Sequence, residues 1–137
     1  MRARLCGLLL LLASASLAAC GGGGVRPSEA AAELDAFTEE LVRKVEGASD
    51  TAAGVREARG VLNARRDGLR AKVLAVRRSE EYARGGAERE RWDERESENV
   101  FRVSGLRTKY VTRAMGDAAL RSELDALVAD FQKLFEP

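Results

Sequence analysis

The sequence of 137 residues contains no histidine, and its two cysteines, Cys6 and Cys20, both lie within the first 20 residues. The absence of histidine excludes imidazole-based catalytic triads, zinc sites with histidine ligands and haem with an axial histidine. The chain after Cys20 holds no thiol, so that part can form neither a disulfide nor a thiol-based site. Carboxylates are therefore the main candidates for site chemistry.

Aromatic residues are also scarce, at 5% of the chain, whereas 33% of the residues are charged. Any hydrophobic core is therefore mainly aliphatic. If the chain starts at Cys20, 21 basic residues face 22 acidic ones, a net charge of −1. This balance argues against a general basic field that would attract nucleic acid or anionic lipid. The length is typical of one domain.

Residues 1–19 have the three zones of a secretory signal peptide. Arg2 and Arg4 provide a cationic start, residues 5–12 are apolar, and residues 13–19 are small and weakly polar. The apolar run is shorter than the roughly 20 residues that a membrane-spanning helix needs. Two alternatives are a soluble N-terminal helix and a plain signal peptide cut after an Ala-x-Ala site.

Leu17-Ala18-Ala19-Cys20 ends this segment and resembles the lipobox of bacterial lipoproteins. In that family a diacylglyceryl group is attached to the cysteine sulfur and the chain is cleaved just before the cysteine. The resemblance implies cleavage between Ala19 and Cys20, with Cys20 as the lipidated first residue. Acyl chains such as palmitate would then anchor the protein to a membrane. Gly21 stands where inner-membrane lipoproteins tend to carry aspartate, which implies the outer membrane, facing the periplasm.

Residues 20–27 are expected to form a short tether between this anchor and the folded domain. Gly21 to Gly24 have no side chains that could pack, so the segment is expected to behave as a flexible linker. Fully extended, residues 21–27 reach at most about 25 Å, at roughly 3.5 Å per residue. The domain is therefore expected to stay close to the membrane surface.

Residues 28–137 are predicted to fold as one all-α domain, an antiparallel bundle of three to four helices. The spacing of apolar residues predicts helices over approximately residues 28–46, 51–84, 87–115 and 118–134. Gly85-Gly86 is the clearest break, and Gly105 is a candidate kink. In the last helix a narrow apolar stripe steps by four and three residues, as packed helix faces do. The stripe comprises Leu120, Leu124, Leu127, Phe131 and Leu134.

Net charge alternates along these segments. It is −5 over residues 28–50, +5 over 56–84, −3 over 86–98, +4 over 99–115 and −3 over 116–137. We expect helices that follow one another in the chain to be antiparallel neighbours of opposite charge, which favours an up-down four-helix bundle. The basic segment 56–84 is then neutralised inside the protein. The alternative is a site for a polyanion.

Three aromatic residues are candidates for a contact surface. Trp92 lies between Arg91 and Arg95, and tryptophan flanked by arginine is typical of an interface. Phe131 and Phe135 could extend an apolar patch at the end of the chain. The alternative for all three is a place in the hydrophobic core.

Glu90, Glu94 and Glu98 lie one helical turn apart and could gather a hard cation. Because Arg91 and Arg95 are interleaved with them, a solvated helix face is the alternative interpretation. No other group of residues offers a metal site, and we expect neither a metal ion nor a cofactor, apart from the covalent lipid on Cys20. No residue is predicted to be catalytic.

The domain is also similar in composition to small periplasmic four-helix b-type cytochromes, around Val45 to Ala53. Those proteins bind haem through a methionine near the first helix and a histidine near the last. Here the methionine is Met115 and histidine is absent, so the resemblance implies a shared type of fold without the haem.

These features predict a lipid-anchored envelope lipoprotein that is not an enzyme. We expect it to act as an interaction or accessory protein at the membrane surface, with a protein partner in the envelope and no nucleic acid. One alternative is a periplasmic helical bundle that binds a small molecule or a metal ion. Another is a purely structural component of the envelope.

Overall fold

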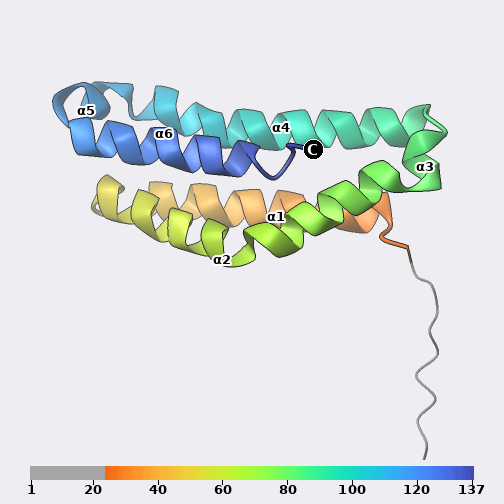
Figure 1. The fold of residues 1–137 in the computed structure, drawn as a ribbon. Helices are drawn as coiled ribbons and strands as arrows, with labels where there is room; N and C mark the ends of the chain where they lie inside the picture. Colours follow the sequence, from red (N-terminus) through yellow and green to blue (C-terminus); the bar gives the residue numbers. More distant parts are fainter. Residues whose placement is uncertain (1–23) are drawn as a thin grey trace, which may run out of the picture.

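The computed structural model describes residues 24–137, which form an elongated helical bundle in which some neighbouring helices run antiparallel and others run parallel (Figure 1). Four long helices build the bundle, and two short ones lie at its ends. The elements are α1 (Pro27–Glu46), α2 (Thr51–Arg78), α3 (Glu80–Ala83), α4 (Ala87–Lys109), α5 (Val111–Gly116) and α6 (Ala118–Gln132). No strand occurs among the described residues. The predicted all-α class is therefore confirmed.

The ends of the helices follow local signals in the sequence. Pro27 begins α1, where its missing N–H is not needed. The side chains of Asp50 and Asp117 cap α2 and α6 by accepting hydrogen bonds from the backbone N–H groups of Ala52 and Leu120. Gly85 and Gly86 both have φ values above 70°, which glycine adopts readily, and they separate α3 from α4.

Two helix ends differ from the prediction. The second predicted helix does not run to Arg84, because Ser79 adopts an extended conformation and its hydroxyl caps α3 by accepting a hydrogen bond from the N–H of Tyr82. The third predicted helix ends at Lys109 rather than bending at Gly105. Tyr110 leaves the helical conformation there, with φ −104° and ψ 13°.

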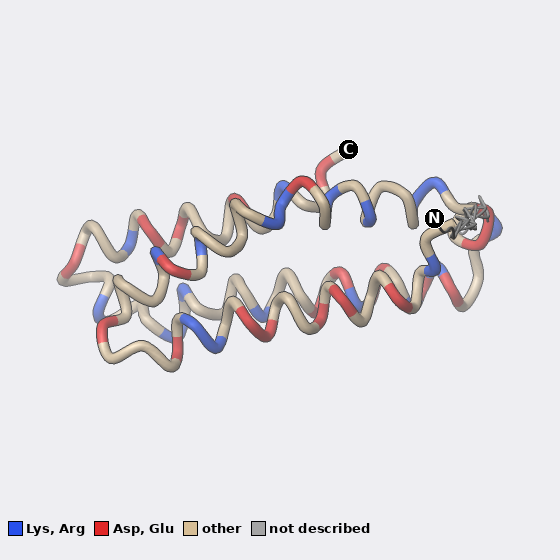
Figure 2. Tube along the Cα trace, turned by 90° about the horizontal axis from the view of Figure 1, so that it is seen from below, with Lys and Arg blue, Asp and Glu red and all other residues tan. Residues whose placement is uncertain are grey.

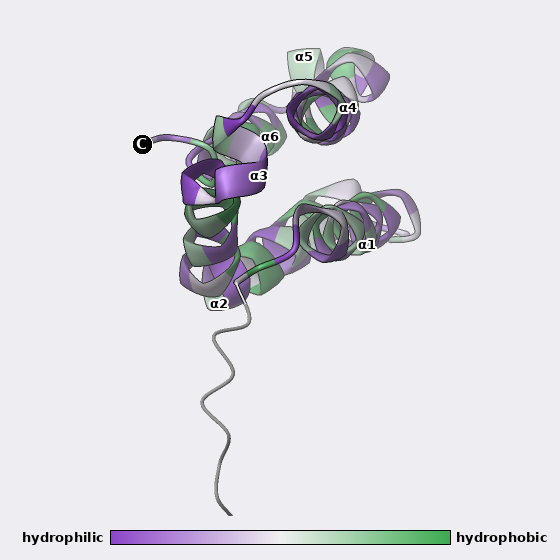
Figure 3. Ribbon diagram, turned by 90° about the vertical axis from the view of Figure 1, so that its right-hand side faces the viewer, coloured by the Kyte–Doolittle hydropathy of each residue, from purple (hydrophilic) through white to green (hydrophobic). Residues whose placement is uncertain are grey.

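The order of helices around the bundle also differs from the prediction. Helix α1 packs against α2 and α4, and α6 packs against the same two helices. The end-on view shows this square, with α2 and α4 at opposite corners (Figure 3). The helices that α3 connects are therefore diagonal, not adjacent. Charges are matched around the square, because each adjacent pair is joined by ion pairs, such as Lys44–Glu57, Arg95–Asp35, Arg59–Glu123 and Arg107–Asp125. Basic and acidic positions are interspersed along the helices (Figure 2).

The core runs along the axis of the bundle and is mainly aliphatic. Its largest fully buried side chains come from every long helix and include Phe37, Leu41, Leu62, Leu106, Leu124, Leu127 and Phe131. Gly54 marks the closest approach of α1 and α2, since a Cβ there would lie 2.6 Å from the backbone oxygen of Lys44. Gly60, in the same helix, has open space around it.

Helix α6 is shorter than α2 and α4 and stops well before the end that carries α3 (Figure 1). The last residues cover part of the gap, because Leu134 and Phe135 are buried. Arg77 of α2 donates hydrogen bonds to the backbone oxygen of Phe135 and to the carboxylate of Glu96 on α4, both at 2.6 Å. Arg77 thus joins the two diagonal helices and the C-terminal tail. No helix of the described residues is long and apolar enough to cross a membrane.

Candidate functional site

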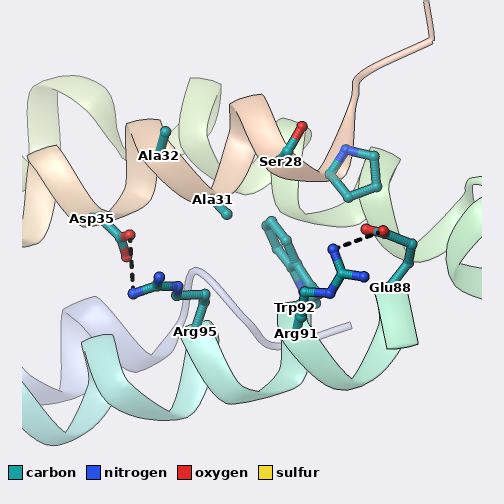
Figure 4. Close-up of a pocket in the computed structure, with 9 residues that line it drawn as sticks. Ser28, Ala31, Ala32, Asp35, Glu88, Arg91, Trp92 and Arg95 are labelled. Carbon is teal, nitrogen blue, oxygen red and sulfur yellow. Dashed lines mark ion pairs between the residues drawn. The ribbon is translucent and has the colours of Figure 1, made fainter. Parts of the chain in front are cut away.

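A groove between the N-terminal halves of α1 and α4 is the first candidate site (Figure 4). Its volume is about 250 Å³. The residues that line it are Pro27, Ser28, Ala31, Ala32 and Asp35 of α1 and Glu88, Arg91, Trp92 and Arg95 of α4. It lies beside the start of α1, where the predicted tether joins the domain.

The groove exists because α1 presents small side chains to α4 at this end. Ala31, Ala32 and Ser28 leave space above the indole of Trp92, which is only 2% exposed. The indole nitrogen Nε1 of Trp92 has no hydrogen-bond partner. Because Nε1 is itself shielded from solvent, the groove meets mainly the apolar part of the ring.

Ion pairs border the groove. Arg95 lies 3.7 Å from the carboxylate of Asp35, and Arg91 lies 3.0 Å from that of Glu88. Both pairs are drawn as dashed lines in Figure 4. Since both arginines already face a carboxylate, the groove offers little net charge to an ionic ligand.

A buried polar contact lies next to the groove and fixes the register of α1 against α4. Asn99 is 1% exposed. Its amide donates hydrogen bonds to the Asp35 carboxylate at 2.7 Å and to the backbone oxygen of Arg95 at 2.8 Å. A single buried polar residue can specify the register between two helices, and this one aligns residues that are 64 positions apart.

The three aromatic candidates lie in the core. Trp92, Phe131 and Phe135 are 2%, 1% and 8% exposed. The rings of Phe131 and Phe135 pack edge to face with centroids 5.6 Å apart. Side chains with so little exposed area cannot form a contact surface without rearrangement. The structure therefore agrees with the alternative interpretation, in which these three residues belong to the hydrophobic core.

The three candidate metal ligands do not converge. Glu90, Glu94 and Glu98 are all exposed, and Glu98 forms an ion pair with Arg95 at 3.2 Å. In the part of the chain that the structure describes, no group of three or more acidic or cysteine side chains could hold a metal ion. Leu17, Ala18, Ala19 and Cys20 lie outside the described residues.

Several cations of the basic segment 56–84 are paired with carboxylates of neighbouring helices. Arg59 contacts Glu123 at 2.6 Å and Asp130 at 3.3 Å, while Arg65 contacts Glu40 at 3.1 Å. The hydrogen bond to Glu123 raises the pKa of Arg59 above its usual value, against the opposing effect of burial. The hydrogen bond from Lys133, assisted by that from Arg59, lowers the pKa of Asp130, although burial opposes it. These pairs support the interpretation that the segment is neutralised within the bundle.

A second candidate site lies on the outer surface of α4 and α5, and the sequence analysis missed it. Phe101, Val111 and Met115 are the large apolar side chains exposed among the described residues, at 78%, 51% and 79%. Phe101 lies on the side of α4 opposite to the buried Val103 and Leu106, whereas Val111 and Met115 follow the break at Tyr110 and belong to α5. We name the positions Phe101, Ser104, Thr108, Val111 and Met115 the outer stripe.

Searches of protein-family models, of curated proteins and of solved structures found no match for this chain.

Proposed function

We propose that the protein is a lipid-anchored lipoprotein of the cell envelope that acts through protein contacts rather than catalysis. The observation that carries the anchor is Leu17-Ala18-Ala19-Cys20, which follows a cationic start and a short apolar run in the order that lipoprotein processing needs. Two or more acyl chains hold a protein stably at a membrane, whereas one chain binds only marginally.

The position of the domain fits this anchor. Helix α1 begins at Pro27, so only six residues separate it from Cys20. This tether holds the bundle within about 25 Å of the bilayer, at roughly 3.5 Å per residue. Gly21 favours the outer membrane, with the bundle in the periplasm.

Metabolic labelling with an alkyne analogue of palmitate tests the anchor. We expect label on the wild-type chain and none on Cys20→Ala, which should also keep the size of the uncleaved precursor. Cys6→Ala is the matched control, since it removes the other cysteine and should still be labelled. A Cys20→Ala protein that fractionates with membranes at mature size would show that the anchor is wrong.

The contact role is supported by the outer stripe, because Phe101, Val111 and Met115 are large apolar side chains that the folded protein leaves exposed, and exposed apolar patches mark interaction surfaces. Recovery of a specific partner from native membranes is the expected result. Failure to recover one, together with a measured turnover on a substrate, would contradict the role.

A small-molecule carrier is the second candidate, and the groove between α1 and α4 favours it. Its volume of about 250 Å³ is just below the roughly 300–1,000 Å³ of common ligand pockets. A ligand-dependent rise in melting temperature that Ala31→Trp abolishes would support this candidate, since the larger side chain should fill the groove. The contact role predicts no such rise.

A further inference from the structure

The outer stripe has the spacing of a helix-packing face. Phe101, Ser104 and Thr108 of α4 step by three and four residues, which is the period of a coiled-coil seam. Tyr110 then interrupts the helix, and Val111 and Met115 belong to the separate helix α5. Along α4 the stripe lies opposite to the face that packs into the bundle. Helix α4 therefore presents one such face to the core and a second one to the outside.

Two separate hollows lie along the outer stripe. Phe101 and Met115 stand out at 78% and 79% exposure, while Ser104, Gly105 and Thr108 between them are small. A hollow of about 440 Å³ lies over Gly105, between Phe101 and Lys109. A smaller one, of about 200 Å³, lies beside Val111 and Met115. Small residues at the centre of a stripe allow a second helix to approach closely.

The charges around the outer stripe are mainly positive, although Asp125 also lines the smaller hollow. Residues 99–115 contain four basic side chains and no acidic one. Arg107 and Lys109 are paired with Asp125 and Glu46 of neighbouring helices. Arg102 forms no ion pair within residues 24–137, and neither does Arg121 of α6, which lines the smaller hollow. Arg113 is directed elsewhere, because it donates a hydrogen bond to the Thr51 hydroxyl of α2 at 2.7 Å.

We propose that the outer stripe binds one amphipathic helix of a partner protein whose flanks carry aspartate and glutamate. The apolar face of that helix packs over Phe101 and the hollow at Gly105, and its carboxylates pair with Arg102 and Arg121. A helix fills the hollow over Gly105, whereas a flat bilayer surface cannot. This inference rests on the proposed contact role and names the surface and the kind of partner.

A designed peptide tests the proposal directly. The probe is a fluorescent helical peptide of about three heptads, with leucine at the first and fourth positions and glutamate beside them. Its binding to the mature protein in nanodiscs of neutral lipid is measured by anisotropy, with empty nanodiscs as the blank. We expect saturable binding that weakens as salt is added. A peptide with lysine in place of glutamate should bind at least tenfold more weakly.

Thr108→Arg is the decisive variant, because it fills the hollow with a long side chain at an exposed position. We expect it to weaken peptide binding at least tenfold without changing the melting temperature. Ser97→Arg is the matched control. It adds the same side chain to an exposed position of α4 on the same side, one turn before Phe101, and should change the affinity by less than twofold.

Three results would overturn the proposal. One is equal affinity of Thr108→Arg and wild type, and another is equal affinity for the two peptides. The third is a sedimentation experiment in which the wild-type protein self-associates and Thr108→Arg is a monomer. The stripe would then bind a second copy of this chain rather than another protein. None of these results affects acyl labelling of Cys20 or partner recovery through another face, so the proposed function is tested separately.

Discussion

Two stripes with the same spacing have opposite surroundings in this protein. In α6 and the residues after it, Leu120, Leu124, Leu127, Phe131 and Leu134 step by four and three and are all buried. The outer stripe of α4 and α5 steps by three and four, and its large members are exposed. A heptad spacing therefore identifies a packing face, but it does not tell whether the partner of that face lies in the same chain.

The side chains of the two stripes explain the difference. Every position of the α6 stripe holds a large apolar residue, whereas Ser104 and Thr108 occupy the centre of the outer stripe. A core position without a large apolar side chain would leave a cavity, which is destabilising. The same small residues on an outer surface provide room for another molecule.

The largest expected difference is between truncations in the two stripes. Leu127→Ala should lower the free energy of unfolding by about 2–5 kcal/mol, because Leu127 is fully buried and its removal leaves a cavity. Met115→Ala should change it by less than about 0.5 kcal/mol. Urea unfolding monitored by circular dichroism measures both. Equal losses would mean that Met115 is packed in the folded protein.

The sequence predicted the helices better than their arrangement. The capping residues Asp50 and Asp117 and the Gly85-Gly86 break are local signals, and the structure has helix ends at all three. The diagonal relation of α2 and α4 could not be predicted from segment charges. Individual cations of α4 pair with carboxylates of both α1 and α6, and one of them, Arg95, comes from a segment with a net negative charge.

Two glycines of α2 also differ in their surroundings, because one faces a neighbouring helix and the other faces open space. Gly54→Ala should destabilise the protein by about 1–3 kcal/mol, because the added Cβ would lie 2.6 Å from a backbone oxygen of α1. Gly60→Ala should stabilise it by about 1 kcal/mol, since it meets open space and improves helix propensity. Thermal unfolding of both variants measures the sign, and a stabilising Gly54→Ala would contradict the close approach of α1 and α2.

A smaller difference in stability is expected between the loss of a partly buried ion pair and the loss of an exposed one. The pKa of Asp130 in the folded protein lies below the ordinary value of 3.8. Its carboxylate therefore stabilises the fold at neutral pH, and this contribution is lost as the pH falls through the folded-state pKa. Asp130→Asn should therefore lower the free energy of unfolding by about 1 kcal/mol at pH 7. The deficit should disappear in acid, where the wild-type carboxyl is protonated.

Asp67→Asn is the control for this pH dependence. Asp67 is 92% exposed and pairs only with the adjacent Arg66, so the variant should be as stable as wild type at both pH values. A deficit of Asp130→Asn that stays constant with pH would show that packing, rather than charge, holds Asp130 in place.

The candidate sites differ in how far the sequence could reveal them. The groove at Trp92 depends on small residues of α1 lying opposite α4, and Asn99 and Asp35, which set this register, are 64 residues apart. No local sequence pattern shows that these two residues are neighbours in the fold. The apolar residues Phe101, Val111 and Met115 were visible in the sequence, but only the burial of Val103 and Leu106 shows that Phe101 lies on the outer side of α4, and the break at Tyr110 separates it from the other two.

Photocrosslinking in native membranes tests the central claim, that the outer stripe is the contact surface. Photoreactive p-benzoylphenylalanine is placed at Phe101 and Thr108 and, as controls, at the exposed Ala36 of α1 and Ala129 of α6. We predict that the two outer-stripe positions crosslink to an acidic helical segment of one other protein and that the two control positions do not. Equal crosslinking from all four positions, or none from the outer stripe, would contradict the claim.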